Sequence, residues 1–166
     1  GWDKIDQGSA FLVEQLPRIL LGAGRPPKSL LDLGCGYGYL TLMTRDLALE
    51  RRVATDNNAA ALLAIAKNAE HYALQIEVVA DDVASELAPG FDLILCNPPF
   101  HQGFSVDGAL TDKFLRQTRR LLSAQGMAVF VVNQFIPLER AAQKYFPVID
   151  TVGRNPSFKL IRLARG

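Results

Sequence analysis

Short apolar runs alternate with longer segments of helical periodicity along the 166-residue chain. Each apolar run is rich in Val, Ile or Leu and ends in a polar residue or glycine, which is typical of a buried strand. The segments between them repeat apolar residues at helical spacing. We therefore predict strands at residues 29–35, 51–56, 76–81, 91–97, 126–133, 148–154 and 158–165, and helices at residues 9–21, 39–48, 58–72, 109–122 and 136–146.

The order of these elements predicts how the strands pair. Strands that alternate with helices form right-handed crossovers and a parallel sheet that is covered on both faces. The last two strands are separated only by Asn155, Pro156 and Ser157, which is too short for a crossover, so they form an antiparallel hairpin at the sheet edge. The predicted fold class is α/β: a doubly wound, mostly parallel seven-stranded sheet with a C-terminal antiparallel hairpin.

Composition favours one packed domain over residues 1–166. Hydrophobic residues make up 49% of the chain and charged residues 21%, which is enough apolar surface for a core. No apolar run approaches the roughly 18 residues that span a bilayer, and the first residues lack the pattern of a secretory signal. Cys35 and Cys96 are too few for a disulfide framework. We therefore predict a cytoplasmic protein that has no membrane contact.

Charge is divided unevenly along the chain. Residues 1–97 carry 8 Lys and Arg against 13 Asp and Glu, a net charge of −5. Residues 98–166 carry 10 Lys and Arg against 4 Asp and Glu, a net charge of +6. This polarity indicates either a basic face that meets phosphate or an uneven scatter of solvated charge, and the sequence leaves both open.

The first predicted strand runs into a glycine-rich loop, Asp-Leu-Gly-Cys-Gly-Tyr-Gly at residues 32–38. Its glycines permit a tight turn and a close approach of the backbone to a ligand. Their G-x-G-x-G spacing differs from the G-x-G-x-x-G of dinucleotide sites. Asp32 would repel a pyrophosphate but suits a cationic ligand. A tight turn without a ligand is the alternative.

Acidic residues end the next two predicted strands, at Asp56 and at Asp81 and Asp82. In a doubly wound sheet these strand ends open into the crevice where ligands bind. Asp56 is placed to accept the ribose hydroxyls of a nucleoside, and Asp81 and Asp82 to accept an adenine amine. Alternatively, each of them caps a helix. Taken together with Asp32, they match an adenosine-type ligand that carries a positive charge.

The fourth predicted strand ends in Asn97-Pro98-Pro99-Phe100. The two prolines stiffen the loop and remove two N–H donors. The acceptors that remain are the Asn97 side-chain oxygen and nearby carbonyls, and Phe100 offers a stacking face. Acceptors without donors fit a planar amine as the group to be modified. No His, Cys, Asp and Glu residues have metal-ligand spacing, so we predict no metal.

These motifs resemble the class I S-adenosylmethionine-dependent methyltransferases, in particular the amino-methylating group with an [NDS]-P-P-[YFW] motif. The longer strings DQGSAFLVEQLP, CNPPFHQG and SFKLIRLAR are similar to bacterial ribosomal RNA guanine-N2 methyltransferases of the "methyltransferase small" domain family. The resemblance covers nearly the whole chain, from Asp6 to the C-terminal hairpin. It implies S-adenosylmethionine as cofactor and methyl transfer to guanine N2 of ribosomal RNA, free or within a ribosomal subunit.

The resemblance also implies roles for individual residues. Hydrogen bonds from the amine to the Asn97 side chain and the Pro98 carbonyl would localise the nitrogen lone pair. The catalytic residues are those of the motif: Asn97, Pro98, Pro99 and Phe100. The residues expected to contact the base are Phe100, His101 and Lys159. The residues expected to bind the cofactor are Asp32, Gly34, Cys35, Gly36, Gly38, Asp56, Asn57, Asp81, Asp82 and Asn97.

Two alternative functions stay open at this point. The motif fits any planar amine or amide, so the substrate would alternatively be an adenine amine or a protein glutamine amide. The second alternative is a non-catalytic nucleic-acid-binding module of the same fold. The family usually carries a degenerate copy of the domain upstream, whereas this chain begins with Gly1 directly before the motifs. We therefore expect the C-terminal part of a longer protein with an upstream degenerate domain.

Overall fold

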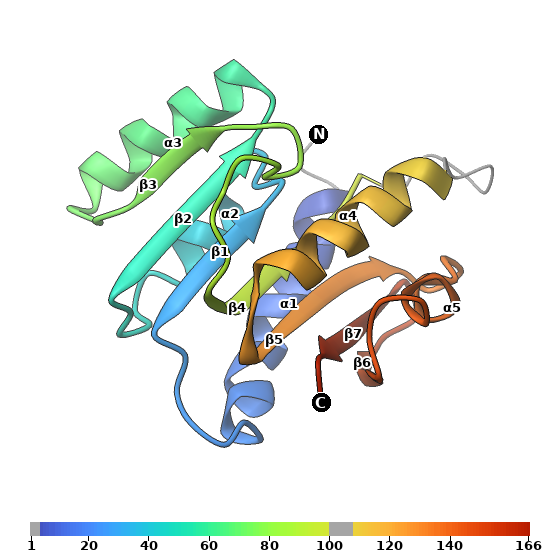
Figure 1. The fold of residues 1–166 in the computed structure, drawn as a ribbon. Coiled ribbons are helices and arrows are strands. Elements are labelled where there is room, and N and C mark those ends of the chain that lie inside the picture. Colours follow the sequence, from blue (N-terminus) through green and yellow to red (C-terminus); the bar gives the residue numbers. More distant parts are fainter. Residues whose placement is uncertain (1–3, 100–107) are drawn as a thin grey trace.

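The computed structural model describes residues 4–99 and 108–166, and seven strands within them form one sheet (Figure 1). The strands lie close to the predicted ranges because each is an apolar run that the sheet buries. Their bounds are β1 (Ser29–Leu33), β2 (Arg51–Asp56), β3 (Glu77–Ala80), β4 (Phe91–Cys96), β5 (Leu122–Asn133), β6 (Val148–Arg154) and β7 (Phe158–Ala164).

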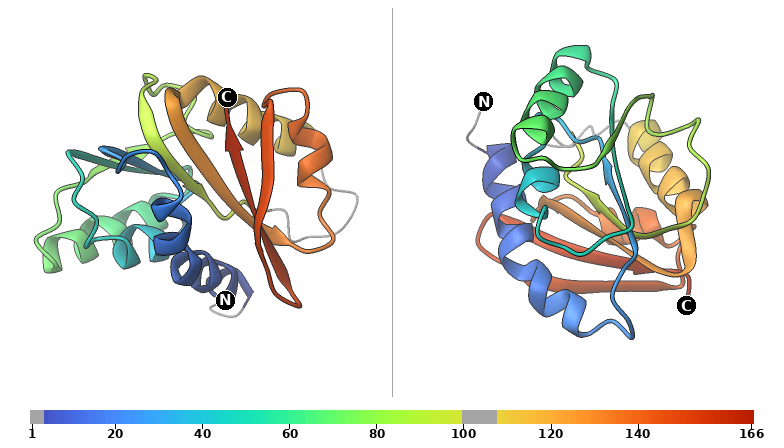
Figure 2. Two further views of the ribbon diagram at one scale, coloured as in Figure 1. Left: turned by 90° about the horizontal axis from the view of Figure 1, so that it is seen from below. Right: turned by 90° about the vertical axis from the view of Figure 1, so that its left-hand side faces the viewer.

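Helices precede or connect these strands, and two of them are single short turns. Their bounds are α1 (Lys4–Leu21), α2 (Tyr39–Met43), α3 (Ala59–His71), α4 (Gly108–Leu121) and α5 (Leu138–Ala142). α1, α2 and α3 lie on one face of the sheet, and α4 and α5 lie on the other (Figure 2). Leu12 of α1 shares one apolar core with Leu95 and Val129 of the sheet. Phe114 of α4 shares the core on the opposite face with Phe130.

The strands follow the order β3-β2-β1-β4-β5-β7-β6. Neighbouring strands from β3 to β5 pair in parallel, and β7 pairs antiparallel with both of its neighbours. The predicted fold class, a doubly wound and mostly parallel sheet with a C-terminal antiparallel hairpin, is therefore confirmed. β7 lies inside the sheet, where Leu160 and Ile161 are fully buried, and β6 forms the edge.

Several element boundaries differ from the predicted ranges, and the first residues of β5 and α1 are two of them. β5 begins at Leu122 and follows α4 without a loop, because Leu122 pairs with Phe91 of β4 before the register shifts. α1 begins at Lys4 and continues through Pro17. Ser9 therefore lies within α1 rather than at its first turn, and its hydroxyl is available for contacts outside the helix.

Candidate active site

The carboxyl ends of β1, β2, β3 and β4 meet at one edge of the sheet because these four strands run in parallel (Figure 1). The glycine-rich loop, the acidic strand ends and the Asn-Pro-Pro turn all follow these ends. The structure therefore gathers the predicted site residues within the described part of the chain along one edge. Phe100 and His101 lie outside the described residues, so their predicted roles stay predictions.

Left-handed backbone conformations shape the glycine-rich loop. Gly34, Gly36 and Gly38 have φ angles of 68°, 52° and 90°, a region that side chains other than glycine rarely enter. A Cβ atom at Gly38 would lie 2.3 Å from Cγ1 of Ile65, so Gly38 lets the loop pack closely against α3. A Cβ atom at Gly36 would meet nothing within 4 Å. Gly36 therefore borders open space.

Asp56 joins the glycine-rich loop to the start of α3. Its Oδ2 accepts a hydrogen bond from the backbone N of Gly36 at 2.8 Å, and its Oδ1 accepts one from the backbone N of Asn58 at 2.9 Å. Asn58 in turn caps α3 through its side-chain oxygen. Asn57 is exposed in the same turn. The carboxylate thus fixes the loop, and the ribose contact of Asp56 and the cofactor contact of Asn57 stay predictions.

Asp32 lies buried beneath the loop, with 2% of its surface exposed. Its Oδ2 accepts hydrogen bonds from the backbone N of Thr41, at 3.1 Å, and from the Thr41 hydroxyl. Among the described residues, its Oδ1 is buried and has no hydrogen-bond partner. Burial raises the pKa of Asp32 to about 6, and the nearby Asp56 charge adds to this rise. Within residues 4–99 and 108–166, this carboxylate oxygen therefore has no donor.

Both cysteines are buried and face apolar surroundings. The Cys35 side chain belongs to the core formed with Ile65 of α3, so the cofactor contact predicted for residue 35 is left to its backbone. Burial, followed by the negative charges of Asp32 and Asp56, raises the pKa of the Cys35 thiol well above its usual range. Burial also raises the pKa of Cys96. Neither thiol is therefore set up as a nucleophile.

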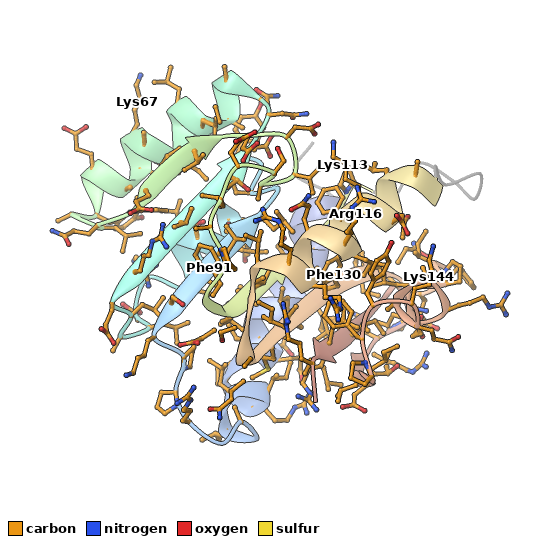
Figure 3. All side chains as sticks on the ribbon, viewed as in Figure 1. Lys67, Phe91, Lys113, Arg116, Phe130 and Lys144 are labelled. Atoms are coloured by element: carbon orange, nitrogen blue, oxygen red, sulfur yellow. The ribbon has the colours of Figure 1, made fainter. Side chains whose placement is uncertain are left out.

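Asp81 and Asp82 differ in their surroundings after β3. Oδ1 of Asp81 accepts a hydrogen bond from the Ser85 hydroxyl at 2.9 Å, and Oδ2 accepts one from the backbone N of Glu86 at 2.7 Å. Asp81 therefore fixes its own turn, and the described structure has no helix there for it to cap. The Asp82 side chain is 64% exposed and forms an ion pair with Lys113 of α4. Lys113 is labelled in Figure 3. Asp82 is the carboxylate of the two that remains accessible to a ligand.

The Asn97 side chain is held by the N-terminal helix. Its Nδ2 donates a hydrogen bond to the Ser9 hydroxyl oxygen at 2.9 Å. Asn97 is half-buried, Pro98 is buried and Pro99 is exposed. Because the amide nitrogen is engaged on α1, the other terminal atom of the side chain is the carbonyl oxygen, an acceptor. The acceptor role predicted for the Asn-Pro-Pro motif stays a prediction.

Lys159 lies away from solvent in β7. Its side chain is 7% exposed, and its Nζ pairs with Oε1 of Glu139 in α5 at 2.7 Å. The base contact predicted for Lys159 stays a prediction, and the structure adds an internal partner that the sequence did not indicate.

Four residues at or near this edge were missed in the sequence. Thr41 holds Asp32, Lys113 holds Asp82 and Ser9 holds Asn97. Phe135, which follows β5 and is 77% exposed, stands on a turn fixed by a hydrogen bond from its backbone N to Oδ1 of Asn133 at 3.0 Å. Phe135 left a signal as an apolar residue two positions after the end of β5, and Ser9 lies in the string DQGSAFLVEQLP that carries the resemblance. The contacts of Lys113 and Ser9 join residues that are far apart in the chain, and that of Thr41 joins two neighbouring elements.

Residues 4–99 and 108–166 offer neither a metal-binding cluster nor a membrane-spanning helix. No group of three or more His, Cys, Asp or Glu residues in this part could hold a metal ion. Each helix there is too short or too polar to cross a bilayer.

The sheet, the glycine-rich loop and the Asn-Pro-Pro turn are those of a methyltransferase domain. The family model of the methyltransferase small domain matches residues 1–162, and the chain belongs to this family. Among curated proteins, the chain is 33% identical over 163 residues to the ribosomal RNA small subunit methyltransferase C of Hahella chejuensis. That match covers 98% of this chain and 46% of the relative.

Other relatives give the same picture. The protein of the same name from Aeromonas hydrophila is 32% identical over 159 residues, 95% of this chain and 44% of its own length. The solved structure of the T. thermophilus 16S rRNA N2 G1207 methyltransferase (RsmC), in complex with AdoMet and guanosine, has a TM-score of 0.86 and 28% identity. The match covers 99% of this chain and 44% of that one. The chain thus spans about half the length of the curated relatives it matches.

Proposed function

We propose that this chain is the catalytic domain of an S-adenosylmethionine-dependent methyltransferase that methylates N2 of guanine in ribosomal RNA. The observation that carries the proposal is the Asn97 amide, which is held at the carboxyl edge of the sheet with its nitrogen on Ser9. We further propose that residues 1–166 are the C-terminal part of a longer cytoplasmic protein, because the matching relatives are about twice as long. The upstream degenerate domain remains part of this proposal.

The residues around the glycine-rich loop fit S-adenosylmethionine. Oδ1 of Asp32, which has no hydrogen-bond partner in the described part of the chain, suits an ammonium group. The open space beside Gly36 leaves the backbone accessible. Asp56 and Asp82 offer carboxylates for ribose hydroxyls and an adenine amine. When bound, S-adenosylmethionine supplies an electrophilic methyl group on a sulfonium.

The Asn-Pro-Pro turn would activate the acceptor nitrogen. The lone pair of an arylamine is spread into its ring, so the nitrogen is a poor nucleophile. Hydrogen bonds from this amine to the Asn97 carbonyl oxygen and the Pro98 carbonyl would localise the lone pair and aim it. Phe100 would stack on the base, which must lie in a loop or be flipped out of a helix.

Methyl transfer tests the proposal directly. Labelled S-adenosylmethionine is offered with deproteinised rRNA, with unmodified ribosomal subunits and with bulk protein, and the labelled product is digested to nucleosides. Label in N2-methylguanosine supports the proposal. Label in methyladenosine or in protein glutamine keeps the fold and overturns the substrate. Absence of both label and cofactor binding favours a non-catalytic nucleic-acid-binding module.

The Asn97→Ala variant tests the acceptor role. Removal of the amide takes away one positioned acceptor, so turnover should fall on the order of 100-fold or more. Asn97 is one of ten residues expected to contact the cofactor and lies outside the glycine-rich loop, so S-adenosylmethionine affinity should stay within a few-fold, as measured by calorimetry. Asn68→Ala, on an exposed position of α3, serves as the matched control. Wild-type turnover in Asn97→Ala would contradict the acceptor role.

A further inference from the structure

We propose that Ser9 is a positioning residue, which fixes the Asn97 amide so that its carbonyl oxygen, not its NH2 group, faces the amine to be methylated. The inference rests on the proposed function and adds to it a residue from another part of the chain. Ser9 and Asn97 lie 88 positions apart in sequence, yet the Ser9 oxygen accepts a hydrogen bond from Nδ2 of Asn97 at 2.9 Å.

Ser9 makes this contact from a buried position in α1, and the preceding residue lets the two segments approach each other. Ser9 is 3% exposed. A Cβ atom at the preceding Gly8 would lie 3.4 Å from Nδ2 of Asn97 and 3.2 Å from Cε1 of Phe158. Gly8 therefore lets the backbone of α1 come close to the turn, and Ser9 supplies the polar atom. Because α1 packs against β5 and β7, it also anchors the contact to the sheet.

The chemistry of an amide makes this contact directional. The two ends of an Asn side chain have nearly the same shape, but one accepts hydrogen bonds and the other donates them. A serine within a helix commonly donates its proton to the carbonyl of the preceding turn, which leaves its oxygen as an acceptor. An acceptor at Ser9 selects the orientation in which Nδ2 points to α1. The opposite orientation would set an NH2 group against the NH2 group of the substrate.

Loss of this selection should appear in the rate of the chemical step. In Ser9→Ala, kcat should fall by about tenfold or more, the size expected for one lost hydrogen bond to a buried group. The affinity for S-adenosylmethionine and the KM for rRNA should stay within about twofold. Ser9→Thr keeps the hydroxyl and should retain kcat within about threefold. The experiment uses the whole protein, including any segment beyond these 166 residues.

Ser29→Ala is the matched control for loss of a serine hydroxyl. Ser29 lies at the opposite end of β1, where its hydroxyl donates to the carbonyl of Gly90 at 3.3 Å and accepts from the backbone N of Asp92 at 3.0 Å. We expect this variant to lower the thermal midpoint without changing kcat. Ser9→Ala should show the reverse, with a changed kcat at temperatures where the protein is fully folded.

A double-mutant cycle separates orientation from packing. In Asn97→Asp both terminal atoms are acceptors, so no orientation needs to be selected, and measurable transfer should remain. In that background Ser9→Ala should lower kcat by less than about twofold. The same fold loss with Asn or Asp at position 97, or an equal loss in Ser9→Ala and Ser9→Thr, would assign the effect to packing and overturn the proposal.

The failure of this proposal differs from the failure of the proposed function. If the unaltered protein puts no label into N2-methylguanosine, the proposed function fails. If it does so, and Ser9→Ala keeps its kcat, only the role of Ser9 is overturned.

Discussion

At the residue scale, the burial of Asp32 raises the free-energy cost of ionising its carboxyl group. One of its oxygens is held by Thr41 and the other has no partner among the described residues. Ionisation of such a carboxyl group is unfavourable, because the free-energy cost of removing its charge from water exceeds the stabilisation that hydrogen bonds from one residue provide. A cationic ligand would offset this cost. The buried carboxyl group of Asp32 therefore makes the ligand-free protein less stable and would favour binding of the cofactor.

Asp32 predicts a pH dependence of stability. Its pKa is raised from 3.8 to about 6 in the folded protein, so the folded state binds the proton more tightly than the unfolded state does. The contribution of Asp32 to the unfolding free energy is fully present below about pH 4 and is lost as the pH rises through 6. The total loss is about 3 kcal/mol. Relative to wild type, Asp32→Asn should therefore gain unfolding free energy between pH 4 and pH 7.

Denaturant titrations of the ligand-free protein across this range measure the effect. Thr41→Val, which removes the neighbouring hydroxyl without removing the carboxylate, should retain the pH dependence. A constant difference between Asp32→Asn and wild type at all pH values would show that Asp32 does not titrate in this range.

Two glycines of one loop should respond differently to the same change at the scale of elements. Gly38→Ala would force a methyl group into Ile65 of α3, at a φ angle of 90°, and should lower the unfolding free energy by about 2–4 kcal/mol. Gly36→Ala meets no atom within 4 Å and should cost only about 1–2 kcal/mol for its left-handed backbone. Denaturant unfolding compares the two, and equal losses would contradict the packing of the loop on α3.

Of the two substitutions, Gly36→Ala should reduce S-adenosylmethionine binding more. Its methyl group would enter the open space that we assign to the cofactor, so S-adenosylmethionine affinity should fall although the fold is nearly intact. Calorimetry at a temperature where both variants are folded tests this part.

The pair between β7 and α5 gives a further prediction. Glu139→Gln would leave the buried ammonium of Lys159 without its counter-charge, and because Glu139 is partly exposed we expect a loss of about 1–3 kcal/mol of unfolding free energy. Replacing both residues, as Lys159→Met with Glu139→Leu, should recover most of the loss. In that stable variant, reduced rRNA affinity would support the predicted base contact of Lys159, and unchanged affinity would exclude it.

The sequence was sufficient to predict those parts of the site that depend on strand ends. Each buried strand is an apolar run, and the parallel topology brings the residues that follow to one edge. The sequence was insufficient where a contact from a residue far away in the chain determines the local structure. The helix predicted over residues 39–48 ends at Met43, because the Arg52 guanidinium of β2 donates hydrogen bonds to the carbonyl oxygens of Thr44 and Leu47, at 3.0 and 3.2 Å. No local pattern reveals such a contact, and the same holds for Ser9 and Asn97.

The two halves of the chain, which differ in net charge, supply strands on opposite sides of the sheet. The strand order places β3, β2 and β1 on one side of β4, and β5, β7 and β6 on the other. The strands and helices of residues 108–166 therefore gather on one side, where α1 also packs against β5 and β7. Residues 98–166 together carry a net charge of +6. Lys113, Arg116 and Lys144 lie on that side, whereas Lys67 lies on α3 at the other (Figure 3). This placement favours the interpretation of a basic face over that of scattered charge.

Charge reversal on the two sides should affect rRNA binding unequally. Lys144 is 70% exposed and shares Asp112 with Arg116, so Lys144→Glu should weaken rRNA binding and reduce its salt slope by about 1. Lys67→Glu, the same change on exposed α3, should leave both nearly unchanged. Binding titrations over a range of salt concentrations measure the two variants. Equal losses would indicate a general effect of net charge without a defined face.

The place of β7 between β5 and β6 sets the order in which the sheet can be assembled during translation. β6 is synthesised first, but its sheet neighbour is β7, so β6 leaves the ribosome with no strand to join and the edge of β5 stays open. Such an edge invites wrong pairing in a nascent chain. The turn at Asn155 shortens that interval, because its Oδ1 accepts from the backbone N of Ser157 at 2.8 Å and of Phe158 at 2.6 Å. A hairpin closed by these local bonds can dock on β5 as one unit as soon as residue 164 has emerged.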